Sequence, residues 1–115
     1  MGLSWDDAVA YALTLPDTEL GSAYGKPAVK VASNGRGILG PGHEPQDSFV
    51  MLIDRDMVEM LLETDPESFY QTPHYAGYGA VLVRYATPDP DRVRHMIGVA
   101  RDQAAAMKPT KPRKK

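Results

Sequence analysis

The segment Thr72–Tyr85, TPHYAGYGAVLVRY, contains the change from turn to strand on which the fold depends. Its first half is polar, aromatic and interrupted by glycine, which is typical of a surface turn. Its second half is apolar, and Val81 and Val83 stand two positions apart, the period of a strand with one buried face. We therefore predict a strand over Tyr78–Ala86 that follows an aromatic turn.

A similar arrangement of turn and strand occurs upstream. The turn Tyr24–Pro27 precedes Ala28–Ala32, where Val29 and Val31 alternate with Lys30. Asn34-Gly35 then predicts a hairpin with a type I′ turn, because both residues tolerate the positive φ that this turn requires. Further strands are expected at three segments: Thr18–Ala23, Ile38–Leu39 and Ser48–Ile53.

Three helices are indicated by their start signals. Ser4 can cap a helix over the segment that begins at Trp5, and Asp54 or Asp56 can cap a second. Asp89-Pro90 has the arrangement of an N-cap followed by proline at the first helical position. Each helix is followed by a proline that prevents its extension.

The predicted order of elements is α-β-β-β-β-α-β-α. Because most early strands are joined by hairpin-length connections, we predict an α+β fold, a two-layer sandwich of a mainly antiparallel sheet with helices on one face. Residues 1–107 form the single domain, and 108–115 a disordered basic tail. The residues expected on the helix-covered side of the sheet are Val29, Val31, Val81 and Val83.

Composition restricts the setting of the protein. The 115 residues include no cysteine, so disulfides and thiolate metal sites are excluded. The first residues, MGLSWDDAVA, lack the basic and apolar regions of a signal peptide, so none is expected, and no apolar run reaches the roughly 20 residues of a membrane span. We expect a cytoplasmic protein with no membrane partner.

The net charge of −2 is unevenly distributed. Residues 1–107 hold all 15 acidic side chains and 8 basic ones, a net charge of −7. The tail KPTKPRKK adds five cations and no acid. A body of this charge repels phosphate backbones, so binding of nucleic acid would need a local basic patch or the tail.

Motifs for cofactors, metals and nucleophiles are not convincing. Gly35–Gly40 matches G-x-G-x-x-G, but the following Pro41-Gly42 cannot begin the long helix that would receive a pyrophosphate, so a hairpin is the better interpretation. His43, His74 and His95 are scattered, so neither a metal site nor a cofactor is expected. No serine lies in a recognisable catalytic motif.

Two segments carry a resemblance to a known family. Gly25-Lys26-Pro27 and Pro73–Gly79, PHYAGYG, stand where the MmcQ/YjbR family of small bacterial proteins has its most recognisable motifs. The chain resembles this family from about Trp5 to Ala106. The resemblance implies a similar plan and DNA binding, but it supplies no catalytic residues. The family often has tryptophan where this chain has Ala80, so one stacking group is missing.

The candidate binding residues belong to the two turns and their strands. We expect Lys26 to lie close to the His74–Tyr78 turn at one end of the sheet, and Lys30 and Arg84 to hold a phosphate or carboxylate if their strands are neighbours. The alternative is structural: the aromatic side chains close a turn, and the two cations face solvent. The candidate residues are Lys26, Lys30, His74, Tyr75, Tyr78 and Arg84.

The basic tail is a second candidate. It could anchor the protein to DNA by counterion release, or act only as a solubilising terminus. Its cations are Lys108, Lys111, Arg113, Lys114 and Lys115.

The sequence leaves three functions open. The first is a DNA-binding protein, as the resemblance implies. The second is a protein-interaction or chaperone-like module without nucleic-acid binding, which suits the acidic body. The third is an enzyme centred on Lys26, His74 and Tyr78, for which the sequence offers no catalytic constellation.

Overall fold

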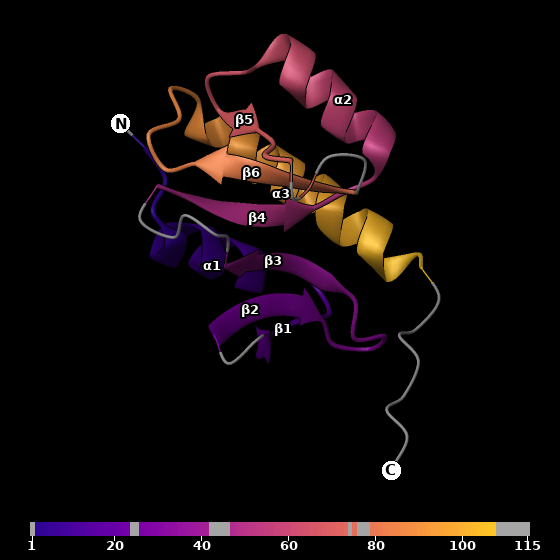
Figure 1. Cartoon of the computed structure of the whole chain (residues 1–115). Helices are drawn as coiled ribbons and strands as arrows, with labels where there is room; N and C mark the ends of the chain where they lie inside the picture. The colour runs from indigo at the N-terminus through magenta and orange to yellow at the C-terminus, as the bar shows by residue number, and fades with distance from the viewer. Residues whose placement is uncertain (1, 24–25, 42–46, 74, 76–78, 108–115) are drawn as a thin grey trace.

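The computed structural model describes residues 2–23, 26–41, 47–73, 75 and 79–107. The fold has three helices and a six-stranded sheet. The elements in chain order are α1 (Trp5–Leu13), β1 (Thr18–Ala23), β2 (Lys26–Val31), β3 (Gly37–Pro41), β4 (Ser48–Leu52), α2 (Arg55–Thr64), β5 (Phe69–Tyr70), β6 (Ala80–Arg84) and α3 (Pro90–Ala105). In the view of Figure 1, α1 and α3 lie behind the sheet and α2 lies above it, next to β5.

The sheet has the strand order β1-β2-β3-β4-β6-β5, and every neighbouring pair is antiparallel. The predicted α+β class, its antiparallel sheet and its order of elements are confirmed. The two-residue β5 is an addition, because Phe69 and Tyr70 are too short a run to be distinguished from a loop by pattern.

Side chains cap all three helices as their sequences indicate. Ser4 Oγ accepts a hydrogen bond from the backbone N–H of Asp7 at 3.0 Å, and Asp54 Oδ1 accepts from that of Met57 at 2.9 Å. Asp89 Oδ1 accepts from the N–H of Arg92 at 3.1 Å, with Pro90 opening α3. Each cap satisfies an N–H that has no partner within its own helix.

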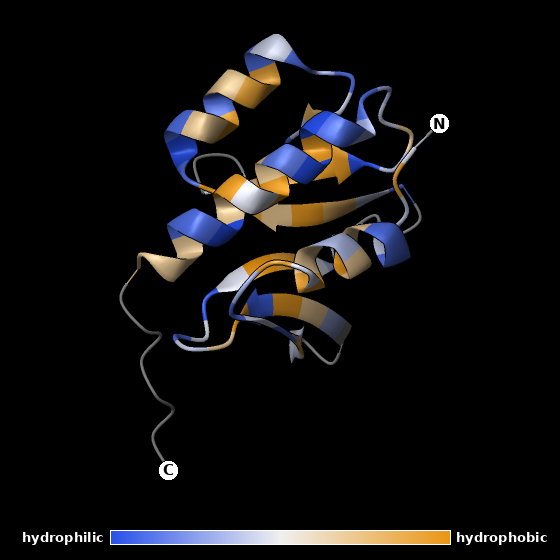
Figure 2. Ribbon diagram, turned by 180° about the vertical axis from the view of Figure 1, so that it is seen from behind, coloured by the Kyte–Doolittle hydropathy of each residue, from blue (hydrophilic) through white to orange (hydrophobic). Residues whose placement is uncertain are grey.

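The core is formed by one face of the sheet against the helices. Val29, Val31, Val81 and Val83 are fully buried in one cluster with residues of α1, α2 and α3, which confirms the predicted side of the sheet. Figure 2, from behind, shows α3 crossing in front of the sheet with polar residues outward. The described residues include no helix long and apolar enough to cross a membrane.

The hairpin between β2 and β3 forms, but the predicted two-residue type I′ turn is wrong. Gly35 has φ of 75°, whereas Asn34 does not have positive φ. Asn34 is instead nearly buried, and its Nδ2 donates to the carbonyl oxygens of Ala104 at 2.8 Å and Met107 at 3.2 Å. The amide thus satisfies carbonyls at the end of α3, a tertiary role that a local turn rule does not include.

Truncating Val83 to alanine tests the burial of this face. We expect Val83→Ala to lower the free energy of unfolding by about 1–3 kcal/mol, from lost apolar burial and the cavity left behind. Denaturant titration measures it, with Val99→Ala, at a partly buried position on α3, as the matched control. Equal effects of the two substitutions would contradict this account of the core.

Candidate binding site

The structure separates the two turns that were expected to form one site. Val29, Leu39, Met51 and Val81 form a row across β2, β3, β4 and β6, so β2 and β6 run in opposite directions. Lys26, the first residue of β2, therefore lies at the end of the sheet where β6 finishes. Gly79, which closes the aromatic turn, lies at the other end. The predicted proximity of Lys26 to this turn is wrong.

The predicted pair of Lys30 and Arg84 also does not form. β3 and β4 lie between their strands, three interstrand steps or about 14 Å, and the two residues stand at opposite ends of the sheet. Lys30 Nζ is 4.0 Å from a carboxylate oxygen of Glu19, and the Arg84 guanidinium lies 4.1 Å from the centre of the Tyr70 ring. The alternation of apolar and charged residues predicted correctly which face of the sheet Lys30 and Arg84 occupy, but it could not predict the order of the strands.

Of the aromatic turn, Tyr75 is described, whereas His74 and Tyr78 lie outside the described residues, as do Lys108, Lys111, Arg113, Lys114 and Lys115. Tyr75 and Tyr70 pack on Val50, Ala80 and Leu82, on the sheet face away from the helices. Gln71 Nε2 donates to the carbonyl oxygens of Tyr75 at 3.0 Å and Ala80 at 2.8 Å. For Tyr75, these contacts support the structural alternative.

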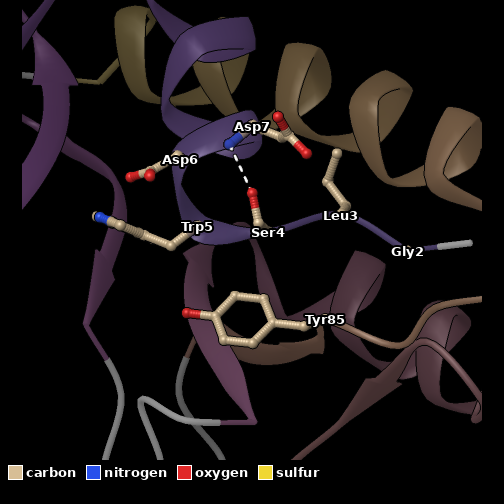
Figure 3. A pocket seen from close by; sticks show the side chains of 7 residues that line it. All are labelled: Gly2, Leu3, Ser4, Trp5, Asp6, Asp7 and Tyr85. Carbon is tan, nitrogen blue, oxygen red and sulfur yellow. Dashed lines mark hydrogen bonds between the residues drawn. The ribbon is translucent and has the colours of Figure 1, made fainter.

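A different site is formed where the N-terminal segment meets the end of β6. A hollow of about 590 Å³ lies between the start of α1 and Tyr85 (Figure 3). The backbone N–H of Leu3 donates to the carbonyl oxygen of Tyr85 at 2.9 Å, and the Leu3 side chain is buried. A side chain at Gly2 would collide with the same carbonyl oxygen. These contacts fix the start of α1 against the sheet.

Aromatic rings form the wall of the hollow. The ring of the buried Phe49 lies between those of Trp5 and Tyr85, and both centroid distances are 5.9 Å. Trp5 meets Phe49 at 61°, an edge-to-face arrangement that favours the electrostatics of the two rings. Trp5 and Tyr85 are only half-buried, so the core holds them in place while they remain accessible from the hollow.

The electrostatics of the hollow are acidic. Asp6 and Asp7 are exposed, and within the described residues neither carboxylate has an ion-pair partner. In Figure 3 the Asp6 carboxylate, the Trp5 indole nitrogen and the Tyr85 hydroxyl point to one side, whereas the Asp7 carboxylate turns away. Burial, and then the nearby Asp6 carboxylate, raise the pKa of Tyr85 above its ordinary value of 10.0.

This site was missed because its parts are far apart in the sequence. Trp5 fits the apolar stripe of a helix, Asp7 fits the first turn of a capped helix, and Tyr85 directly follows a strand, 80 positions after Trp5. Each residue has a sufficient local explanation. The spatial grouping depends on β6 returning to the N-terminal segment, which only the strand order reveals.

Residues 1–107 contain eight lysines and arginines. Four of them lie within 4.0 Å of a carboxylate, in the pairs Lys30–Glu19, Arg92–Asp65, Arg94–Asp91 and Arg101–Asp102. The exposed Arg55 lies beside Asp54, Asp56 and Glu59 around another hollow. In the part of the chain that the structure describes, no group of histidine and carboxylate ligands could hold a metal ion.

Comparison of the chain with protein-family models, curated proteins and solved structures gave no match. The resemblance to the MmcQ/YjbR family therefore stays a prediction.

The raised pKa of Tyr85 predicts a specific loss of stability in alkali. The unfolded chain ionises at the ordinary pKa of 10.0 and the folded chain only at higher pH. The free energy of unfolding of the wild type should therefore fall, relative to Tyr85→Phe, as the pH rises above about 10. Denaturant titrations of both proteins over this range measure the difference.

Asp6→Asn provides the control for the cause. This substitution removes the smaller of the two causes of the raised Tyr85 pKa and leaves the burial of Tyr85 unchanged. The stability that Asp6→Asn loses in alkali, measured against the double variant Asp6→Asn with Tyr85→Phe, should therefore be smaller than the loss of the wild type measured against Tyr85→Phe, but still present. Identical pH profiles for the wild type and Tyr85→Phe would contradict the raised pKa.

Proposed function

We propose that this protein is a protein-interaction module that binds a basic segment of a partner protein, and that the hollow of Trp5, Asp6 and Tyr85 receives a lysine or arginine side chain. The observation that carries the proposal is an accessible aromatic pair beside a carboxylate that has no ion-pair partner in the described part of the chain.

The chemistry of the hollow fits an organic cation. A cation over the face of tryptophan or tyrosine is stabilised by about 0.5–2 kcal/mol, with the larger values where water is excluded. The Asp6 carboxylate adds Coulombic attraction, and the neutral Tyr85 hydroxyl can accept a hydrogen bond from an ammonium or guanidinium group. Contact of Trp5 and Tyr85 with Phe49 keeps the rings in place before the ligand arrives, which reduces the entropic cost of binding.

An anionic ligand fits this position less well. The start of a helix carries a partial positive charge of roughly half a unit and would attract anions. Here the Ser4 side chain already accepts from the N–H of Asp7, and Asp6 and Asp7 place two carboxylates in the first turn. The two full negative charges outweigh the helix dipole and repel a phosphate.

The charge of the whole body supports the same class of partner. A net charge of −7 over residues 1–107 attracts basic segments at long range and repels nucleic acid. The ion pairs of Lys30, Arg92, Arg94 and Arg101 occupy four of the eight cations of residues 1–107, which reduces the number available to contact phosphates. The described residues that line the hollow include no histidine, lysine or cysteine, so the proposal is for binding without a chemical step.

DNA binding is the second candidate, and the tail favours it. Five cations within the last eight residues could neutralise phosphates and release counterions. On this view the tail binds DNA without sequence preference, and the acidic body faces away from it. The resemblance to the MmcQ/YjbR family implies DNA binding as well.

Fluorescence of Trp5 tests the protein-binding proposal, because it is the single tryptophan of the chain. We expect titration with an arginine-rich peptide to change the Trp5 emission saturably, and an acidic peptide of equal length to leave it unchanged. Asp6→Asn should weaken binding about two- to fivefold, the effect of losing a partly exposed ion pair.

Asp56→Asn is the matched control, since Asp56 is an exposed carboxylate in the first turn of α2 and the change in net charge is the same. If Asp6→Asn and Asp56→Asn weaken peptide binding equally, the interaction depends only on the overall charge of the protein, and the hollow is not the binding site.

Deletion of residues 108–115 tests the second candidate. If the tail supplies the affinity, the deletion should nearly abolish binding to duplex DNA measured by fluorescence anisotropy. With the intact chain, engagement of five phosphates would give a slope near −4.5 for log affinity against log salt, about 0.9 per contact. Tight binding of one particular duplex by the shortened chain at physiological salt would overturn this tail-driven account.

A further inference from the structure

The outer edge of β1 is available for pairing with another strand. β1 ends the sheet order, at the bottom of the sheet in Figure 1, and pairs on its other side with β2 over all six residues. Among the described residues no element pairs with its outer edge. Natural proteins usually protect such an edge with lysine, proline, a bulge or a very short strand. Thr18–Ala23, TELGSA, contains none of these features, and its single charged side chain is that of Glu19.

The register determines which backbone groups face outward. The N–H of Ala32 donates to the carbonyl oxygen of Asp17 at 2.8 Å, one step beyond the pair of Thr18 and Val31. Because antiparallel pairs alternate between bonded and non-bonded, Glu19 and Gly21 bond to β2. Thr18, Leu20 and Ser22 therefore present their N–H and C=O groups at the free edge.

Side chains on this edge suit an apolar contact. Leu20, in the middle of β1, is 54% exposed, the largest exposed fraction among the large apolar residues of the described surface.

The one charged residue of β1 is Glu19, and its carboxylate is 4.0 Å from Lys30 Nζ. This separation is at the long limit for an ion pair and leaves the lysine able to take a second carboxylate.

We propose that β1 pairs antiparallel with β1 of a second copy of this chain, about a two-fold axis at Leu20, which joins the two sheets into one. In this register Leu20 faces Leu20 of the second copy, and Thr18 faces Ser22. Each of these residues donates one backbone hydrogen bond and accepts one. Such an interface is isologous, because both copies contribute the same surface.

Charge complementarity selects this register. Glu19 of one copy stands opposite Gly21 of the other, at a Cα separation of about 4.5 Å for a pair without direct hydrogen bonds. The Lys30 side chain lies across Gly21: a Cβ added there would be 2.8 Å from Lys30 Cε and 3.3 Å from Nζ. Each Lys30 thus lies where Glu19 of the second copy arrives.

The two neighbouring symmetric registers place like charges together. A shift that puts Glu19 opposite Glu19 brings two carboxylates face to face. A shift in the other direction puts Gly21 opposite Gly21 and so brings the two Lys30 ammonium groups together. Like charges directly opposite each other destabilise strand pairing. The register centred on Leu20 avoids both and forms two new ion pairs.

Pairing of two six-residue strands buries less surface than the roughly 1,200–2,000 Å² of a stable interface, so the dimer is expected to be reversible. The hollow at Trp5 contains no residue of β1 and stays open in both copies. The dimer would present two such sites to a partner, and this inference does not depend on what they bind.

Sedimentation equilibrium of the full chain over a wide concentration range tests the proposal. The wild type should show a monomer–dimer equilibrium. Ser22→Pro removes an outward N–H that no ladder bond uses, so it should leave the circular dichroism spectrum unchanged and give a monomer. Ser22→Thr keeps the N–H and should dimerise like the wild type. A wild type that is monomeric at every concentration would overturn the proposal, and so would a folded Ser22→Pro protein that dimerises normally.

Charge exchange provides a second test that leaves the backbone intact. Glu19→Lys places the new lysine next to Lys30 of its own copy and next to Lys30 of the second copy. Because like charges repel, it should weaken dimerisation at least tenfold. Adding Lys30→Glu restores opposite charges at both places and should restore the dimer. If Glu19→Lys does not weaken the dimer, or the exchanged pair fails to restore it, the register is wrong. In hydrogen exchange, protection of the Leu20 and Ser22 amides should rise with protein concentration, whereas that of Glu19 and Gly21 should be constant.

Discussion

The fold depends on sealing one face of the sheet from water. Val29, Leu39, Met51 and Val81 form a continuous row across four strands, and all are buried against the helices. Each apolar side chain removed from water in this way contributes about 1.5–3 kcal/mol. Since a one-residue slip of any strand would turn its apolar residues to the outer face, this burial also fixes the register. The helices, caps and connecting turns are placed by that requirement.

Register and strand order then determine where functional groups gather. Insertion of β6 beside β4, rather than at the edge of the sheet, brings the end of β6 to the N-terminal segment. Tyr85 thereby reaches Phe49 and Trp5 and forms the aromatic wall with Asp6 above it (Figure 3). The same order places Lys26 and Gly79 at opposite ends. The strand order thus creates the acidic hollow, and it also prevents Lys26 and the aromatic turn from forming one site.

Acidic side chains outnumber basic ones by 15 to 8 over residues 1–107, and four of the eight cations form described ion pairs. Ion pairs such as Arg92–Asp65 and Arg101–Asp102 contribute little stability where they are exposed, but they neutralise groups that could otherwise contact phosphate. The carboxylate of Asp6, next to half-buried rings, has no such neutralisation among the described residues. This contrast, and not the total charge alone, is the basis of our proposal that the folded body binds a basic protein segment. The five cations of the tail remain a separate electrostatic element.

The sequence alone determined the α+β class, the buried valine face and the helix starts at Ser4, Asp54 and Asp89, because period-two burial and N-capping are local. Tertiary structure decided the strand order, the role of Asn34 at the end of α3, the short β5 and the hollow of Trp5 and Tyr85. Lys30 shows the division clearly: alternation predicted its outward face, but its position over Gly21 depends on the pairing of β1 with β2. Local patterns in the sequence specify which face of the sheet a side chain occupies. Its neighbours depend on the pairing of strands that are far apart in the sequence, and no single segment specifies that pairing.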